Sequence, residues 1–232
     1  MIQLRRSNDR GRTKLNWLDS RHTFSFGDYH DPQHMSFSDL RVINEDRVAA
    51  GAGFPTHSHR DMDIVTYVLE GALAHKDSTG TSSVIHVGDV QRMSAGTGIS
   101  HSEYNASPSE PVHFLQIWIM PNKTGLAPAY EQQPFPLDDQ INKWTLIGSE
   151  AGRDGSVTVH QNVEIWAARF ASGAQASFRL KPSRRAWTHI ARGAGMLNST
   201  LLQAGDGAAV SQEELVEFKA VEDAEIILFD LN

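Results

Sequence analysis

The 232-residue sequence contains no cysteine. Without thiols the chain has no disulfide cross-links and no thiolate ligands, so a structural zinc site of the usual cysteine-rich kind is excluded. No run of ~18 apolar residues occurs, and the N-terminus, which begins Met1-Ile-Gln-Leu-Arg-Arg, lacks the apolar segment of a secretion signal. We therefore expect a cytoplasmic protein with no membrane-spanning segment.

Positive charge is also scarce in this sequence. The 28 Asp and Glu residues outnumber the 21 Lys and Arg residues, which gives a formal net charge of −7 at pH 7. An acidic chain is a poor binder of DNA or of an anionic membrane, so direct binding to nucleic acid is not expected. One basic run near the N-terminus is short and mixed with polar residues, which is typical of a solvated surface: Arg5, Arg6, Arg10, Arg12 and Lys14.

The remaining composition is that of an ordinary globular protein, with 40% apolar and 21% charged residues. Short apolar or alternating segments bounded by turn residues predict β-strands along the whole chain, and no amphipathic segment of three helical turns is found. We therefore predict an all-β fold. The strands are expected at residues 17–26, 40–44, 64–69, 72–77, 84–87, 112–120, 144–147, 157–160, 164–170, 186–190 and 225–231.

Similar segments in the two halves of the chain indicate an internal repeat. Arg192-Gly-Ala-Gly-Met-Leu is similar to Leu69-Glu-Gly-Ala-Leu, and Gly205-Asp-Gly is similar to Gly88-Asp. The repeat predicts two β-sandwich units in tandem. Residues 122–139 are rich in Pro, Gln and Gly, and this composition favours an inter-domain connection over a core strand. We place an N-terminal metal-binding domain at residues 1–135 and a C-terminal domain at residues 136–232.

Two stretches carry potential metal ligands, Gly51–Asp63 and Met93–Glu103. Each stretch offers two ligands separated by one residue, and residues i and i+2 of a strand point to the same face. A predicted strand, a turn at residues 78–80 and a returning strand bring the second pair opposite the first. Three imidazoles and one carboxylate then form a predicted metal site with room for exogenous ligands. The ligand pairs are His57 with His59 and His101 with Glu103.

This set of donors suits a borderline divalent metal, and Fe, Co, Ni, Cu, Mn and Zn are all compatible with it. An octahedral metal with four protein ligands keeps two positions open, one for a substrate oxygen and one for dioxygen or water. Gly96 and Gly98, in the loop before His101, permit close backbone approach of a ligand.

Structural or surface roles are favoured for the other histidines considered. His22, His30 and His34 lack a ligand at position i+2, and His160 and His189 are isolated. In the second half, Pro182-Ser-Arg184 stands where the first half has His57-Ser-His59. We therefore predict that the C-terminal domain is a degenerate copy without metal ligands, which supports the first by packing against it.

Two sequence motifs resemble those of a known family. The motifs read Gly51-x5-His57-x-His59-x3-Asp63-x7-Gly71 and Gly88-x5-Ser94-x-Gly96-x4-His101-x3-Asn105, which resemble the two cupin motifs. The amino-acid sequences of Met93–Glu103 and of Trp17–Phe26 resemble those of pirins, a family of two-cupin proteins. The resemblance implies a bicupin fold of two tandem jelly-roll barrels with one iron(II)-type site in the N-terminal barrel. Its ligands would be His57, His59, His101 and Glu103.

One departure concerns Asp63. Many cupins have a glutamate ligand at this position, whereas pirins take their carboxylate from the second motif. Asp63 is therefore expected to lie behind the ligands and to orient a histidine.

The resemblance also implies a function. Family members open flavonols such as quercetin at the 2,3 bond with O2 and release CO. A bound metal would lower the pKa of the flavonol 3-hydroxyl, and Glu103 would accept that proton as the catalytic base. Four apolar residues are candidate walls of a pocket for the flat substrate, with ordinary core packing as their alternative role: Phe54, Met62, Ile99 and Phe114.

Two other functions are compatible with the sequence. The first is a metal- or redox-responsive binding protein, since pirins also include transcription cofactors that act through a protein partner. The second is an isomerase or a sugar-binding cupin, for which the sequence places no second carboxylate or lysine in the site. Turnover of a flavonol with release of CO distinguishes the dioxygenase from the binding protein.

Overall fold

The computed structural model describes residues 1–232 and contains 22 β-strands and three short 3-10 helices, which confirms the all-β prediction. No helix has the length and apolar character needed to cross a membrane. The 3-10 helices are η1 (Ser7–Asp9), η2 (Leu137–Gln140) and η3 (Arg153–Gly155). The first twelve strands are β1 (Ile2–Arg5), β2 (Gly11–Lys14), β3 (Leu18–His22), β4 (Leu40–Val48), β5 (Gly53–His59), β6 (Asp63–Glu70), β7 (Ala72–Asp77), β8 (Ser82–His86), β9 (Asp89–Ser94), β10 (Ile99–Asn105), β11 (Val112–Ile119) and β12 (Ala129–Pro134). The other ten are β13 (Thr145–Ser149), β14 (Val157–Thr158), β15 (Glu164–Phe170), β16 (Gln175–Arg179), β17 (Arg185–Arg192), β18 (Ala194–Leu197), β19 (Thr200–Gln203), β20 (Gly207–Val210), β21 (Leu215–Ala220) and β22 (Ala224–Leu231).

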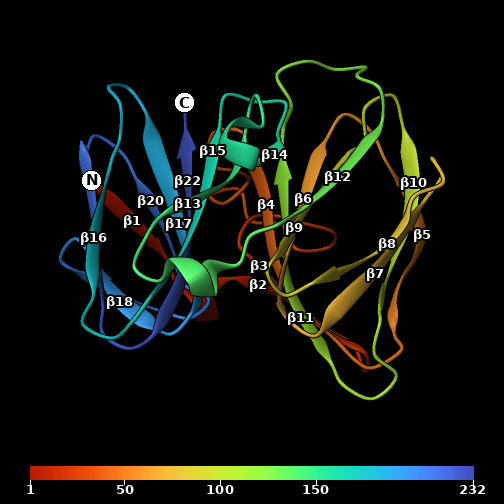
Figure 1. Ribbon diagram of the computed structural model, residues 1–232, viewed down its shortest axis with the longest axis horizontal. Helices are drawn as coiled ribbons and strands as arrows, with labels where there is room; N and C mark the ends of the chain where they lie inside the picture. Colours follow the sequence, from red (N-terminus) through yellow and green to blue (C-terminus); the bar gives the residue numbers. More distant parts are fainter.

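The strands form two β-sandwiches, so the bicupin prediction is confirmed (Figure 1). In the first, a seven-stranded sheet of order β12-β9-β6-β11-β4-β3-β2 is combined with a four-stranded sheet of order β5-β10-β7-β8. In the second, the corresponding orders are β1-β20-β17-β22-β15-β13-β14 and β16-β21-β18-β19. The short pair β13–β14 is parallel, and the other pairs are antiparallel.

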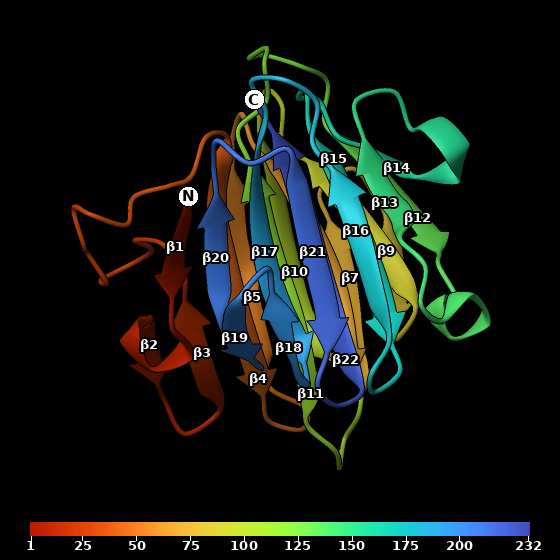
Figure 2. The same cartoon turned by 90° about the vertical axis from the view of Figure 1, so that its left-hand side faces the viewer.

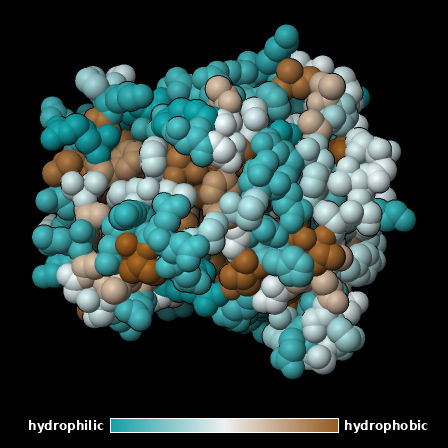
Figure 3. Space-filling view, viewed as in Figure 1, coloured by the Kyte–Doolittle hydropathy of each residue, from teal (hydrophilic) through white to brown (hydrophobic).

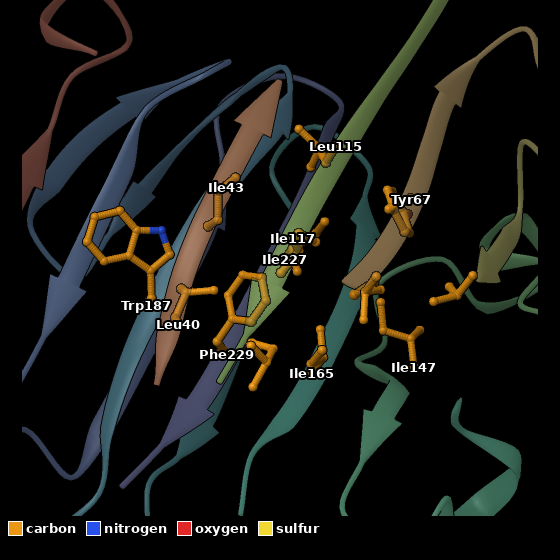
Figure 4. Packing of buried hydrophobic residues seen from close by; sticks show 14 of the residues in the cluster. Leu40, Ile43, Tyr67, Leu115, Ile117, Ile147, Ile165, Trp187, Ile227 and Phe229 are labelled. Atoms are coloured by element: carbon orange, nitrogen blue, oxygen red, sulfur yellow. The ribbon is translucent and has the colours of Figure 1, made fainter. Parts of the chain in front are cut away.

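The two seven-stranded sheets face each other in the middle of the molecule, and the four-stranded sheets lie outside (Figures 1 and 2). A single apolar cluster joins them, with Ile43 and Leu115 from one sheet and Ile165, Ile227 and Phe229 from the other (Figure 4). Central strands are therefore buried on both faces, which explains their continuous apolar sequences. The side of the molecule seen in Figure 3, which is the view of Figure 1, is mostly hydrophilic, with apolar residues in small groups.

Polar contacts also cross between the halves. The buried Tyr67 hydroxyl donates a hydrogen bond to the carboxylate of Glu225, and Arg192 donates to the carbonyl oxygen of Leu69. Arg169 Nε donates to Glu225 at 3.0 Å. This last contact lies within the second half and pairs the buried Glu225 carboxylate, which would be costly to bury alone. The contacts of Tyr67 and Arg192 are the ones that join the halves. The second half therefore covers a face that the first half would otherwise expose.

Several strands are absent from the sequence prediction: β1, β2, β9, β12, β16, β18, β19, β20 and β21. Residues 122–139, predicted as a connection, contain β12, which pairs with β9 at the edge of the first large sheet; that part of the prediction was wrong. Pro134 ends this strand, and an edge strand tolerates proline because one side needs no ladder hydrogen bonds. At the other end, β1 pairs with β20 of the second half. The domain boundary at residues 135/136 stays a prediction.

Candidate metal centre

The candidate centre lies on the four-stranded sheet of the first half, where β5 and β10 are paired. In this register His101 lies opposite His57, and Ile99 lies opposite His59. An irregularity in β10 follows His101, so that Glu103 is opposite Phe54. The strand pairing therefore brings the two predicted ligand pairs onto adjacent strands.

The three imidazole rings converge. The ring centroids of His57 and His101 are 4.4 Å apart, those of His57 and His59 are 4.8 Å apart, and those of His59 and His101 are 4.9 Å apart. One ligand atom from each histidine lies within 4.8 Å of the others. Imidazoles packed this closely cannot all be protonated without repulsion, so the cluster favours neutral rings.

Several ring nitrogens of the three histidines have no hydrogen-bond partner. Nδ1 of His57 lies 2.9 Å from the carbonyl oxygen of Pro55, which accepts a hydrogen bond from it and fixes Nε2 as the atom with a free lone pair. Nε2 of His59 and both ring nitrogens of His101 are buried without a partner. Buried polar atoms are nearly always satisfied, so these orphaned nitrogens fit a metal ion held between the rings.

The electrostatics of the cluster favour metal binding. Burial, helped by the charge of neighbouring His57, lowers the pKa of His59 to about 4. Burial and the neighbouring histidines lower the pKa of His101 to about 3. Both rings are therefore neutral near pH 7, and a neutral imidazole is the form that ligates a metal.

Glu103 lies deeper in the barrel, with a side chain that is almost fully buried. Gln116 on β11 donates from Nε2 to Oε2 of Glu103 at 2.8 Å. Burial raises the pKa of Glu103 to about 7 and the negative charge of Asp46 adds to that rise, against the opposing hydrogen bond from Gln116. The carboxyl group therefore exchanges a proton near neutral pH in the metal-free protein.

Comparisons with known proteins agree with the motifs. The family model described as Pirin matches residues 3–119, and the model described as Quercetinase C-terminal cupin domain matches residues 146–231. The chain belongs to the pirin family. The two matches follow each other along the chain, as expected for a bicupin.

Pirin relatives match this chain from end to end. The quercetin 2,3-dioxygenase of Escherichia coli strain K12 is 46% identical over 231 residues, which cover 100% of this chain and 99% of that protein. The crystal structure of YhhW from Escherichia coli superimposes with a TM-score of 0.96 at 45% identity and covers 100% of this chain and 98% of that one. The complex of bacterial pirin YhhW with nickel(II) has a TM-score of 0.95 at 44% identity, with coverage of 100% and 99%.

The sequence analysis missed one histidine beside this pirin site. His75 on β7 is buried, and in the strand register it lies opposite Glu103 of the neighbouring strand β10. A ligand atom of His75 lies within 4.8 Å of those of His101 and Glu103. Nε2 of His75 lies 3.0 Å from Oδ2 of Asp77, and Nδ1 has no partner. The pattern His75-x-Asp77 was the signal available in the sequence, because both residues face one way from a strand.

Asp63 does orient a histidine, but that histidine is not one of the predicted ligands. Its Oδ2 accepts hydrogen bonds from the backbone N–H of His160 at 2.6 Å and from the ring of the same residue at 3.1 Å. Ser94 donates to Oδ1 of Asp63. Since His160 belongs to the second half, Asp63 ties the two halves together instead of holding a ligand ring.

The other histidines considered in the sequence analysis lie in other surroundings. Nδ1 of His22 is 2.8 Å from Oδ1 of Asn44, His34 is paired with Asp31, and His30 is exposed. His189 is fully buried in the second half, and both of its ring nitrogens lack a partner. None of them joins the cluster of close ligand atoms.

Apolar residues border the rings on one side. Met62 and Ile99 pack in one cluster with Trp118, and the Trp118 ring contacts His59 edge to face, with centroids 4.9 Å apart. Phe54 and Phe114, which were also considered as pocket walls, belong to a different apolar cluster. The wall of the site is thus formed by Trp118 together with Met62 and Ile99.

Proposed function

We propose that the protein is a metal-dependent dioxygenase, with iron(II) as its metal, that opens flavonols such as quercetin at the 2,3 bond with O2 and releases CO. The observation that carries this proposal is a pair of overlapping groups of close ligand atoms that share His101. One group joins His101 to His57 and His59, and the other joins it to His75 and the buried Glu103. The full-length relative named quercetin 2,3-dioxygenase supports the choice of substrate, and the nickel(II) complex of a relative supports a divalent metal.

Four residues would hold the metal: His57, His59, His101 and Glu103. Imidazole nitrogen and carboxylate oxygen suit iron(II) and its neighbours in the first transition series. When bound, the metal supplies Lewis acidity, which lowers the pKa of a hydroxyl group of the substrate. The protein contributes rings that are already neutral, because burial lowers the pKa values of His59 and His101.

Glu103 is the proposed proton acceptor. Oε2 accepts the hydrogen bond from Gln116, so Oε1 is the oxygen left for the metal and for the hydroxyl of a substrate bound beside it. The carboxyl group is buried, and a carboxylate held within hydrogen-bond reach of the substrate can act as a general base. A buried carboxylate of this kind removes a proton that an exposed glutamate would take less readily.

An apolar wall borders the candidate centre beside His59. Trp118 presents an aromatic ring beside His59, and Met62 and Ile99 pack against it. Aromatic and aliphatic side chains complement the flat ring system of a flavonol, while the polar groups of the centre are restricted to one side. The site therefore has the apolar surface and the base that the proposed reaction needs.

Oxygen uptake with quercetin tests the proposal. Protein loaded with iron(II) under anaerobic conditions should consume quercetin and O2, lose this activity on chelation and regain it when the metal is restored. His30→Ala, which removes an exposed histidine that belongs to neither group of close ligand atoms, is the matched control and should retain full activity. Activity that survives complete removal of metal would contradict the proposal, as would inactivity with each of the candidate metals.

A further inference from the structure

Gln116 and Trp118 form a hydrogen-bonded pair behind the candidate centre. Both lie on β11, two residues apart and therefore on one face of the strand, which belongs to the sheet that packs against β5 and β10. Nε2 of Gln116 donates to Oε2 of Glu103 at 2.8 Å, and Nε1 of Trp118 donates to Oε1 of Gln116 at 3.2 Å. The chain of bonds thus runs from the indole to the amide and on to the carboxylate.

The chemistry of the three groups fixes the direction of these bonds. An indole N–H is only a donor, and an ionised carboxylate is only an acceptor. An amide has a donor end and an acceptor end, and either orientation fits the same space. Because Trp118 donates to the amide oxygen, the NH2 end of Gln116 must face Glu103. Without the indole N–H, nothing in this chain of bonds selects that orientation.

Trp118 is itself held in place. Its ring contacts His59 edge to face, with centroids 4.9 Å apart, and contacts Phe26 in the same manner at 5.3 Å. Gln116 is buried, with 8% of its surface exposed. Two residues of β11 therefore contact two predicted ligands. Trp118 contacts the ring of His59, and the amide of Gln116 donates a hydrogen bond to Glu103.

We propose that Gln116, oriented by Trp118, is a positioning residue that holds Glu103 in the geometry required at the metal centre. The hydrogen bond removes rotational freedom from the Glu103 side chain and stabilises its charged form before a metal binds. Gln116 does not contact the substrate or the metal, so its effect is exerted through Glu103. The inference rests on the metal centre of the proposed function.

Groups that orient metal ligands typically contribute ~10–100-fold to metal affinity. Gln116→Leu should therefore reduce the affinity for nickel(II), measured by competition with a chelator, by ~10–100-fold. Trp118→Phe keeps an aromatic ring beside His59 but loses the N–H, and should reduce the affinity by roughly 10-fold. In both variants the absorption spectrum of bound cobalt(II) should change, because it reports the geometry of the ligands.

The second half of the chain offers a matched control. Trp166 on β15 donates from Nε1 to Oε2 of Glu164 at 3.2 Å, again two residues apart on one strand. Trp166→Phe removes the same kind of bond far from the centre, and should leave the nickel(II) affinity and the cobalt(II) spectrum unchanged. Circular dichroism verifies folding, and Gln116→Met, which conserves the side-chain volume, replaces Gln116→Leu if the latter does not fold.

A double-mutant cycle with Glu103→Ala separates the possible results. We expect Gln116→Leu to have no further effect on nickel(II) affinity in the Glu103→Ala background. The positioning role is overturned if folded Gln116→Leu binds nickel(II) like wild type with an unchanged cobalt(II) spectrum, or if its loss is equally large without Glu103. Wild-type nickel(II) affinity in Glu103→Ala alone would instead overturn the centre itself, and this inference with it.

Discussion

Replacing Glu103 by glutamine separates its two proposed roles, metal ligand and base. Glutamine has nearly the same size and keeps an oxygen donor, but it has no charge and is a very weak base. The three histidines remain, so metal affinity should fall only in part. Flavonol turnover by metal-loaded Glu103→Gln should fall by ~10²–10⁴-fold, the usual contribution of a general base.

The same variant should be more stable than wild type without metal. Burial raises the pKa of Glu103 from 4.5 to about 7, and each pH unit corresponds to ~1.4 kcal/mol. Ionising this buried group therefore costs the folded state ~3 kcal/mol. The sign follows from the raised pKa: the stability contribution is complete below pH 4.5 and is lost as the pH rises through 7. Glutamine avoids this loss.

Two assays measure these effects. Urea unfolding of the metal-free proteins should show that Glu103→Gln gains ~3 kcal/mol relative to wild type between pH 4.5 and pH 8. Turnover must be compared at equal metal content, because lost metal would otherwise be mistaken for lost catalysis. If metal-loaded Glu103→Gln turns over quercetin at the wild-type rate, Glu103 is not the base. If its stability relative to wild type does not change with pH, the inference that burial raises the pKa of Glu103 is refuted.

Three further predictions concern the histidines. His57→Ala combined with His59→Ala should abolish metal binding, measured by metal analysis, while circular dichroism shows a folded protein; full metal occupancy would refute the ligand assignment. His160→Ala should leave metal content unchanged but lower the free energy of unfolding by ~1–3 kcal/mol, because the buried Asp63 loses a hydrogen bond; a loss of stoichiometric metal would contradict this. Burial lowers the pKa of His189 from 6.5 to about 3, so its neutral form supports folding above pH 6.5 and this support is lost as the pH falls. His189→Leu should therefore be ~2 kcal/mol less acid-sensitive between pH 8 and pH 5 in urea unfolding, and equal acid sensitivity would refute the reasoning.

The arrangement of the candidate ligands could be predicted because it depends on local geometry. Alternation along a strand places His57 with His59, and a strand that returns after a turn places His101 nearby. The strand pairing in the structure has this arrangement. Gln116 and Trp118 share one face of a strand because they are two residues apart, but the residue that this face contacts could not be read from the sequence of β11 alone.

Features that depend on contacts between distant segments could not be predicted. The pairing of β1 with β20 joins residues about two hundred positions apart and leaves no periodic pattern in the sequence. The proline content of residues 122–139 concealed β12, because an edge strand requires fewer ladder hydrogen bonds. The partner of Asp63 is His160, which lies in the other half of the molecule. Local spacing therefore located the candidate ligands but not the groups that support them.

The central claim is that this metal centre cleaves a flavonol with dioxygen. Its most direct test is the amount of CO released as iron(II)-loaded protein consumes quercetin in a closed vessel. We expect equal molar amounts of CO formed and quercetin consumed, and none of either after chelation or in the combined His57→Ala and His59→Ala variant. Consumption of quercetin without CO, or CO release by the metal-free protein, would contradict it.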